Sequence, residues 1–425
     1  MIAAGGDLLA LLSAAEPRAQ VSPLALDDTR WNAVVRESIR HGVAPLVHAR
    51  LNEAAPHVSV PERARHELKA AYLRTGLENL RLFARLGAAL RSLAAEGIDA
   101  IVLKGAFLAE LVYGNPALRS MGDADVLVRR GDLDRVTRLL RDQGWRQSSG
   151  DAQIAGHQLP TFVLDRALLE IHWAIEDDGS PFDIDTDGLW RRASKVRVAG
   201  VPALALAPED LLLHLCVHAS YSHGWLQFSG GLRPLCDIAL TVRHYAGRFD
   251  WEAFVYRADT WRVRNCVWLT LVLTRELLRA AIPGEVFDLL APTPDAGWVE
   301  TAKGLTLGAH YSELSATLPA LGRNLLTRQW RHLPRAARWR RQLLPARGAL
   351  AAAYPSLGRR PSLRYVAHWA DFTRDCVRAF FAPHARALLE KERNRLALIG
   401  WLENLEPPGH STQPPVVSTL PALDA

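Results

Sequence analysis

The stretch Gly122-Asp123-Ala124-Asp125-Val126-Leu127-Val128 decides the fold prediction. Its acids are followed by apolar residues, as in a strand, where side chains alternate between the two faces. Asp123 and Asp125 are therefore expected to project to the same side. Two adjacent carboxylates repel each other, and ionising both requires a compensating positive charge. Mg²⁺ supplies such a charge, because it prefers oxygen ligands and commonly takes one or two carboxylates plus substrate phosphates. A solvated acidic turn at the end of a strand is the alternative interpretation.

A glycine-containing turn lies upstream of these acids. Residues 98–103 read as a short strand and residues 106–113 as a helix, with Lys104-Gly105 between them. Glycine allows backbone N–H groups to approach a phosphate, and the start of a helix adds a favourable dipole. This pattern predicts a phosphate-binding turn, and an ordinary tight turn with a solvated lysine is the alternative.

A further acid lies downstream, in the predicted strand 168–173. Glu170 is flanked there by apolar residues, and an acid in such a setting needs a partner. A strand beside the aspartates would bring Glu170 to them as a third carboxylate, whereas an edge strand would leave it exposed. His172 shares the face of Glu170 if the strand is regular. It lies beside the metal site or contacts the nucleotide in one interpretation, and is a structural histidine at the strand end in the other, which we favour.

The remaining chain is mostly helical in pattern. Apolar residues recur at three- and four-residue spacing over residues 62–95, and Gly97 follows as a C-cap. Strands and helices then alternate, with Asp132 as the expected N-cap of a helix over 133–143. From Pro208 onward the pattern is again helical. We predict an N-terminal helical region (1–95), a catalytic domain (96–205), a helical domain (206–320), a basic helical region (321–403) and a flexible tail (404–425).

The motifs together resemble a known family. VLKGAFLAELVYGNPALRSMGDADVLV (102–128), LDRVTRLLRDQGW (133–145) and LLEIHW (168–173) resemble the uncharacterised bacterial nucleotidyltransferase family of the polymerase-β superfamily. APEDLLLHLCVHASYSHGW (207–225), LRPLCDIALTV (232–242) and FDWEAF (249–254) are similar to its helical second half. The resemblance covers residues 65 to 280 or so. It departs from the wider superfamily at the turn, which is usually Gly-Ser, and at the third acid, which is usually Asp.

The resemblance implies an α+β fold, with a small mixed-sheet, polymerase-β-like domain embedded in a mostly α-helical chain. It implies an enzyme that uses Mg²⁺ and moves a nucleoside monophosphate from ATP or another nucleoside triphosphate to a hydroxyl acceptor, releasing pyrophosphate. Asp123, Asp125 and Glu170 would be the catalytic and metal-binding acids. Lys104, Gly105 and Arg119 would contact the phosphates. The acceptor would be a small molecule, a peptide or a protein.

Other functions remain open at this stage. A non-catalytic nucleotide-binding module on the same fold is one, although a decayed site tends to lose its acids. Phosphate transfer and an RNA-directed transferase are others. The arginine-rich stretch 323–364, which contains Trp330 and Trp339, would serve RNA or an acidic partner, but no nucleic-acid motif accompanies it. We favour a solvated basic surface there and expect no nucleic-acid partner.

A second cluster of titratable residues lies further along the chain. Asp210, His214 and His218 are spaced by four residues, so they share a helix face, and His223 follows. A zinc site is one interpretation, but the ligand set is incomplete. Histidines that pack against the catalytic domain or line its cleft are the interpretation we favour. Asp237 points into the same cleft or lies on a helix surface.

The composition indicates the net charge of the protein and its cellular compartment. The chain has 425 residues and a formal charge of +6, a balance that suits anionic ligands without choosing among them. Its four cysteines (Cys216, Cys236, Cys266 and Cys376) show no zinc spacing and lie mostly among apolar residues, so we expect buried free thiols in a reducing cytoplasm. Residues 1–20 lack a basic segment, so no secretory signal is expected, and no apolar run suits a membrane span. We expect a cytoplasmic protein without a membrane partner.

Overall fold

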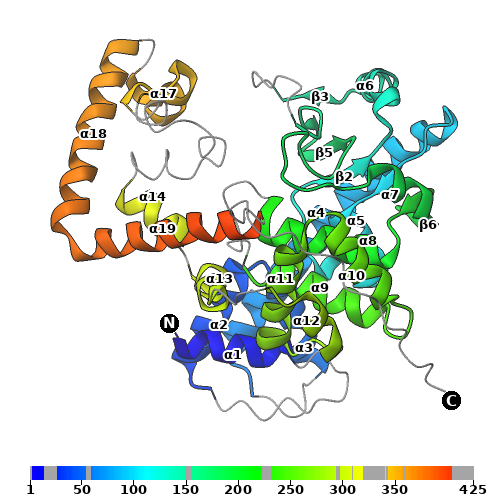
Figure 1. Ribbon diagram of the computed structural model, residues 1–425, viewed down its shortest axis with the longest axis horizontal. Helices are drawn as coiled ribbons and strands as arrows, with labels where there is room; N and C mark the ends of the chain where they lie inside the picture. The colour runs from blue at the N-terminus through cyan, green and yellow to red at the C-terminus, as the bar shows by residue number, and fades with distance from the viewer. Residues whose placement is uncertain are drawn as a thin grey trace, which may run out of the picture.

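The computed structural model describes residues 2–13, 26–53, 59–148, 156–222, 231–292, 297–308, 310–318, 340, 343–357 and 360–403. Within them a seven-stranded mixed sheet is embedded among many helices (Figure 1). The predicted α+β class is therefore confirmed. His223, most of the arginine-rich stretch and the expected tail lie outside the described residues. No described helix is long and apolar enough to cross a bilayer.

The sheet brings together strands that are far apart in sequence. Its members are β1 (Ile101–Val102), β2 (Ala124–Leu127), β3 (Arg146–Gln147), β4 (Phe162–Leu164), β5 (Ala167–His172), β6 (Ser194–Val198) and β7 (Val201–Ala205), in the order β3-β4-β5-β2-β1-β7-β6. Strand β2 lies in the middle, fully buried, antiparallel to β1 and parallel to β5. Side chains at matching positions of β1, β2 and β5 are therefore neighbours.

A long helix supports the sheet and the N-terminal helices. α4 (Glu62–Ala95) has the predicted bounds and, at 34 residues, is about 50 Å long. Its buried side chains recur along one face, which packs against α3 (Ala44–Glu53) and against β5 and β7. α1 (Ile2–Ser13) and α2 (Asp28–Arg40) complete this part, and the side chain of Asp27 caps α2 by accepting from the backbone N–H of Arg30.

The helical half continues the same hydrophobic core. After the sheet come α8 (Pro208–Val217), α9 (Arg233–His244) and α11 (Arg264–Leu278), which pack on one another. The shorter elements after the sheet are η4 (His218–Ser222), α10 (Trp251–Thr260), α12 (Gly284–Leu290) and α13 (Trp298–Leu307). Those that lie between the strands are α5 (Lys104–Phe107), η1 (Leu108–Val112), η2 (Pro116–Leu118), η3 (Arg130–Asp132), α6 (Leu133–Asp142) and α7 (Thr186–Arg192). One buried cluster runs from Leu8 to Leu402.

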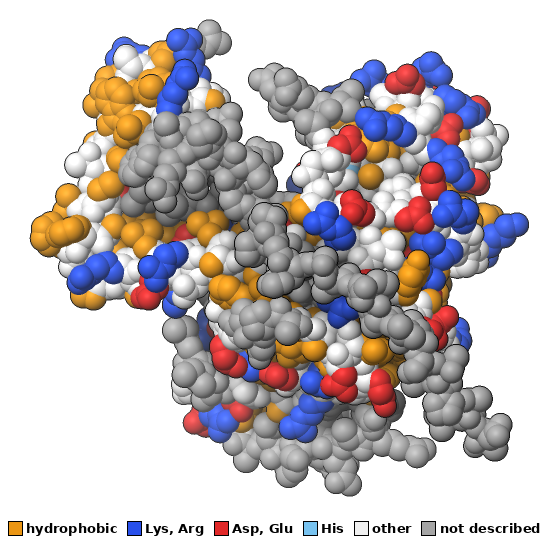
Figure 2. Space-filling view, viewed as in Figure 1, with side chains coloured by type: hydrophobic (Ala, Val, Ile, Leu, Met, Phe, Trp, Pro, Cys, Tyr) orange, Lys and Arg blue, Asp and Glu red, His pale blue; other side chains and the backbone are white. Residues whose placement is uncertain are grey.

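A helical arm stands apart from this body. It consists of α14 (His310–Thr317), α17 (Arg347–Ala353), η6 (Pro355–Leu357), α18 (Pro361–Phe381) and α19 (Pro383–Leu402), and α18 lies along its outer side (Figure 1). Hydrophobic side chains are exposed on it (Figure 2), including Phe380 and Phe381. The end of α19 returns to the body, where the Asn265 side-chain amide donates to the carbonyl of Trp401 (2.7 Å).

Several local expectations were wrong. Asp132 is the N-cap residue of α6 as expected, but its side chain makes no capping hydrogen bond and pairs with Arg135 instead (3.0 Å). Two expected α-helices end in π-helical turns, η1 and η4. The β6–β7 hairpin was not predicted, although Val196 and Val198 alternate with Lys195 and Arg197 in β6. Cys216, Cys236 and Cys266 are buried free thiols as expected, but Cys376 is exposed on the arm.

Candidate active site

The pairing of β2 with β5 brings two of the predicted acids together. Asp125 is directly opposite Glu170 in the parallel register, and His172 follows two residues later on the same face. One ligand atom from each of Asp125, Glu170 and His172 lies within 4.8 Å of the other two. The sheet topology thus supplies a cluster that local sequence only suggested.

Asp125 is the most constrained member of this cluster. Its side chain is buried, and its Oδ1 accepts from the Lys104 ammonium (3.0 Å) and from Nε2 of His172 (3.0 Å). Burial by itself would raise the pKa of Asp125, but the Lys104 charge and the His172 hydrogen bond outweigh it and hold the pKa well below 3.8. Asp125 is therefore a permanent carboxylate in a nearly dry position.

The turn that carries Lys104 is conformationally strained. The backbone N–H of Leu103 donates to the carbonyl of Asp125 (3.0 Å), which fixes the end of β1 beside β2. Lys104 follows at φ +30°, a backbone angle that residues other than glycine rarely adopt. Such strain persists where the surroundings enforce it, often at functional sites. Here it directs the lysine toward Asp125, at the predicted phosphate-binding turn.

Asp123 and Glu170 differ from Asp125 in lacking a cationic partner in direct contact. Asp123 makes no hydrogen bond or ion pair with a described residue, and Glu170 accepts only from the hydroxyl of Thr161 (3.2 Å) and lies 3.7 Å from His172. Burial, followed by repulsion from Asp125, raises the pKa of both. Lys104 is in direct contact with Asp125, while Arg119 and Arg233 act on Asp123 from further away. The carboxylates of Asp125 and Glu170 and the ring of His172 fit a divalent cation, whereas Asp123 lies outside that group.

His172 lies both at the strand end and beside the acids, so the two interpretations of it describe one position. Its ring stacks on that of His157 (centroids 5.3 Å apart), and Nδ1 of His157 lies 2.6 Å from the Asp177 carboxylate. Burial leads the effects that lower the pKa of His172. His157 and Asp177 were not singled out in the sequence, because they follow no strand or helix pattern.

Arg119 approaches the turn from the loop before β2. Its Nε and Nη2 each donate to one oxygen of Asp237 (both 2.8 Å), and the pair is buried. Nη1 points toward Gly105, where an added Cβ would lie only 3.0 Å from it. A side chain at 105 would therefore crowd Arg119, which the ion pair with Asp237 holds in place. Asp237 faces inward and also accepts from the hydroxyl of Tyr113 (2.8 Å).

The helical half adds two groups near these residues. Arg233, at the start of α9, is close enough to Asp123 and Arg119 to interact with both electrostatically. His214 on α8 is buried and interacts with Lys104, Asp125 and His172. His214 was expected to line the cleft or pack against the sheet domain. Arg233 was missed, and its only sequence signal is an Arg-Pro pair at the start of a helix.

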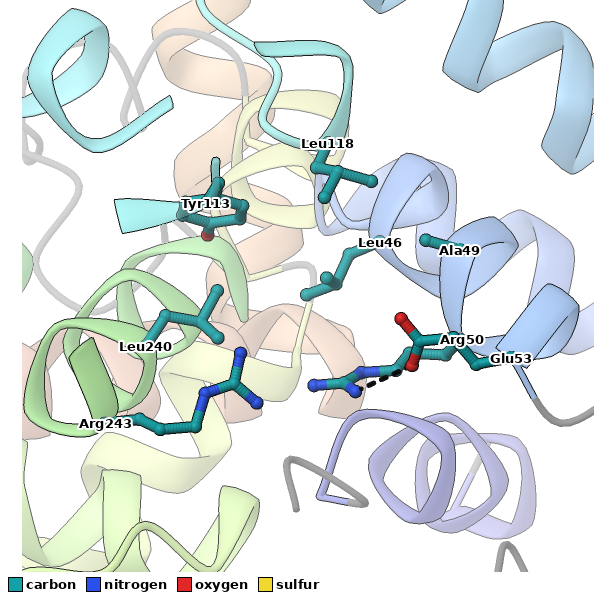
Figure 3. A pocket seen from close by; sticks show the side chains of 8 residues that line it. All are labelled: Leu46, Ala49, Arg50, Glu53, Tyr113, Leu118, Leu240 and Arg243. Carbon is teal, nitrogen blue, oxygen red and sulfur yellow. Dashed lines mark hydrogen bonds and ion pairs between the residues drawn. The ribbon is translucent and has the colours of Figure 1, made fainter. Parts of the chain in front are cut away.

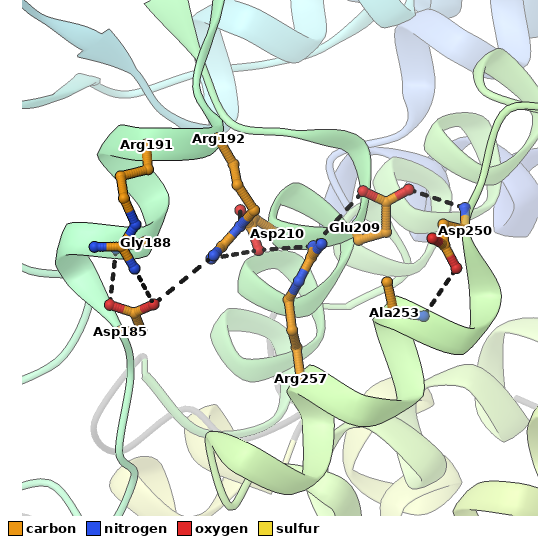
Figure 4. A network of polar contacts seen from close by, with 9 residues as sticks. All are labelled: Asp185, Gly188, Arg191, Arg192, Glu209, Asp210, Asp250, Ala253 and Arg257. Atoms are coloured by element: carbon orange, nitrogen blue, oxygen red, sulfur yellow. Dashed lines mark hydrogen bonds and ion pairs between the residues drawn. The ribbon is translucent and has the colours of Figure 1, made fainter. Parts of the chain in front are cut away.

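Asp210 takes part in a separate ionic network. It is fully buried and pairs with Arg192 (2.7 Å) and Arg257 (3.1 Å), which join α7, α8 and α10 (Figure 4). The rings of His214 and His218 are 6.1 Å apart at their centroids. Within the described residues, the cluster spaced for a metal is the one at Asp125, and it includes none of these three. Asp210 therefore ties α7 of the sheet domain to α8 and α10 of the helical half.

His214 carries an energetic cost that can be measured. Both ring nitrogens are buried without a hydrogen-bond partner among the described residues, and burial holds its pKa well below 6.5. An unsatisfied buried polar group costs about 1–3 kcal/mol. We expect His214→Leu to increase the free energy of unfolding by about 1 kcal/mol at pH 7, measured by chemical denaturation.

The same substitution should change the pH dependence. Below about pH 6.5 the unfolded chain binds a proton at position 214 that the folded chain does not, so the wild-type protein loses stability as pH falls. His214→Leu should lose less between pH 7 and pH 5. The exposed His66→Leu is the control, with an expected change within about 0.5 kcal/mol. A markedly less stable His214→Leu would contradict this account.

The sequence matches one family of known proteins. The model of a family described as "Uncharacterised nucleotidyltransferase" matches residues 27–279. This match covers all the acids above, Lys104, Arg119, His214 and Arg233, and it starts further upstream than residue 65, so that α2 and α3 belong to the shared unit. No curated protein and no solved structure matches the chain.

Proposed function

The chain belongs to the uncharacterised nucleotidyltransferase family, and we propose that it transfers a nucleoside monophosphate from ATP or another nucleoside triphosphate to a hydroxyl acceptor. The observation that carries the proposal is the pairing of Asp125 with Glu170 across β2 and β5, with His172 in the same ligand-spaced group. Asp123 lies outside that group, and burial and the charge of Asp125 raise its pKa. Neighbouring carboxylates are costly unless a cation joins them.

Asp123 and Asp125 hold Mg²⁺ in this proposal, and Glu170 completes the set of acids. When bound, the ion neutralises charge on the phosphates and stabilises the leaving pyrophosphate. Lys104 keeps Asp125 ionised and in place before the substrate arrives, through its 3.0 Å contact. His172 donates to the same oxygen and orients the carboxylate.

The phosphates of the nucleotide lie against the turn of Lys104 and Gly105. Glycine at 105 leaves room for Nη1 of Arg119 to reach this position. Asp237 fixes the guanidinium through its other two donor nitrogens, so that the remaining one is aimed before the ligand binds. A planar guanidinium suits phosphate oxygens because its donors are fixed in a fork.

The reaction is an in-line displacement at the α-phosphorus. The acceptor oxygen forms the new P–O bond, the bond to the bridging oxygen of the β-phosphate breaks, and pyrophosphate leaves. The proton of the acceptor hydroxyl passes to Glu170, whose side chain is 21% exposed compared with 5% for Asp125 and is thus the more accessible acid. The acceptor is a small molecule, a peptide or a protein.

The product mass tests this function. Purified protein is incubated with Mg²⁺, each nucleoside triphosphate in turn and a cell extract, and the labelled products are analysed by mass spectrometry. The expected result is an acceptor that gains one nucleoside monophosphate unit, with release of pyrophosphate. A gain of phosphate alone would indicate phosphoryl transfer, and nucleotide left unconsumed under every condition would contradict the proposal.

A further inference from the structure

Arg233 lies between the helical half and the loop that leads to β2. Its Nη1 donates to the carbonyl of Ser120 (3.3 Å), and its Cδ would lie 3.7 Å from a Cβ added at Gly42. The hydroxyl of Ser120 in turn donates to the carbonyl of Gly42 (3.0 Å). The arginine is therefore hydrogen-bonded to the loop that precedes Asp123 and lies close to Gly42.

The charge of Arg233 is poorly compensated. Among the described residues it forms no ion pair with a carboxylate, and its Nε is buried without a hydrogen-bond partner. Arg119, close by, already occupies both oxygens of Asp237. Burial and then repulsion from Arg119 lower the pKa of Arg233. A partly buried cation with a buried, unsatisfied donor is costly, so an anion is expected to complete the site.

The position of the missing anion is set by its neighbours. Arg233 interacts electrostatically with Asp123 and Arg119, and Arg119 points toward Gly105. A group between these residues lies beside the proposed cation ligands and the phosphate-binding turn together. A nucleoside triphosphate has this distribution of charge, because its β- and γ-phosphates are both anionic and bridge to the metal.

We infer that Arg233 binds the β- and γ-phosphates of the nucleoside triphosphate, next to Arg119. The inference rests on the proposed function and extends it, since it assigns part of the nucleotide site to α9 in the helical half. The sheet domain alone would then lack a cation that the triphosphate needs. Arg233 would distinguish triphosphate from monophosphate, because a monophosphate has no β- or γ-phosphate to place there.

Binding of three ligands to Arg233→Gln tests the inference. Isothermal titration in the presence of Ca²⁺, which is chosen to slow turnover, compares ATP, AMP and inorganic tripolyphosphate on the full chain. Loss of a charge-assisted contact should weaken ATP and tripolyphosphate by about 10- to 100-fold, with AMP changed less than about twofold. Arg233→Lys should recover part of the loss, because it restores the charge without the planar fork.

The control lies on the same helix. Arg243→Gln removes the same charge from α9 at its other end, beside Arg50, and should leave all three affinities unchanged. If Arg233→Gln binds ATP and tripolyphosphate like the wild type, or loses AMP to the same extent, the inference is wrong. If the wild-type protein binds no nucleotide at all, the proposed function fails with it, so the two failures are distinguishable.

Discussion

Asp123→Asn should reduce Mg²⁺-dependent nucleotide transfer by about a thousandfold while leaving the free energy of unfolding nearly unchanged. A metal ion contributes several kcal/mol of transition-state stabilisation, and about 4 kcal/mol corresponds to this factor. Asp123 has no direct partner among the described residues, so asparagine breaks no contact there. Burial and the neighbouring Asp125 raise the pKa of Asp123, so losing the charge relieves repulsion in the folded chain.

Steady-state transfer rates and chemical denaturation check this prediction together. Asp165→Asn is a suitable control, because Asp165 is an exposed acid in the β4–β5 turn and its contact with Arg85 lies at the surface. The control should keep full activity. An Asp123→Asn variant that turns over nucleotide at the wild-type rate would overturn the assignment of Asp123.

Asp125→Asn is a less informative variant, although it should also be inactive. It would leave the Lys104 ammonium beside a neutral amide in a buried position and remove the acceptor that His172 uses. Loss of one partner of a buried pair is strongly destabilising. Because Asp125 has these ionic contacts and Asp123 has none with the residues that the structure describes, we expect only Asp123→Asn to leave the fold intact.

Asp237→Ala should lower the free energy of unfolding by about 3–5 kcal/mol, the range for removing one partner of a buried ion pair. Asp237 is 3% exposed and accepts two hydrogen bonds from Arg119 and one from Tyr113. Without it, the Arg119 charge stays buried beside Arg233 and has no counter-ion. Chemical denaturation of both proteins at neutral pH measures the difference.

An exposed pair of the same geometry provides the matched control. Nε and Nη2 of Arg264 contact the two oxygens of Asp259 (2.6 and 2.8 Å), and these side chains are 33% and 44% exposed, compared with 9% and 5% for Arg119 and Asp237. Asp259→Ala should cost no more than about 1 kcal/mol. Equal losses for Asp237→Ala and Asp259→Ala would contradict the view that burial makes the first pair essential.

A small cavity lies beside Tyr113, the tyrosine whose hydroxyl donates to Asp237. Its volume is about 120 Å³, and its far side carries Arg50 and Arg243 (Figure 3). Arg50 pairs with Glu53 on the same helix, α3 (3.0 Å), so one of the two arginines already has a carboxylate partner.

Local patterns were sufficient for the parts of the fold that depend on local contacts. The apolar spacing of residues 62–95 predicted α4 at its observed bounds, because one face of that helix is buried along its whole length. The alternation around Asp123 and Asp125 predicted β2 to within a residue or two. The β6–β7 hairpin was overlooked, although in β6 the exposed Lys195 and Arg197 alternate with Val196 and Val198 as in a half-buried strand.

Contacts between distant residues were beyond sequence reasoning. Arg119 and Asp237 are 118 positions apart, and nothing near either residue indicates that they pair. His214 and Arg233 reach the site only because α8 and α9 pack beside the sheet. The acids are different, since two adjacent aspartates and one isolated glutamate on strands are locally visible. Which carboxylate would be free and which bound to Lys104 depends on the assembled sheet.

The most direct test of the central claim is a titration of Mn²⁺, used in place of Mg²⁺, into the wild-type protein and Asp123→Asn with a non-hydrolysable nucleoside triphosphate analogue present. Electron paramagnetic resonance reports the fraction of bound ion. We predict that the wild type binds Mn²⁺ and that Asp123→Asn binds it more than about tenfold less tightly. Equal binding by the two proteins would contradict the assignment of a cation to these acids.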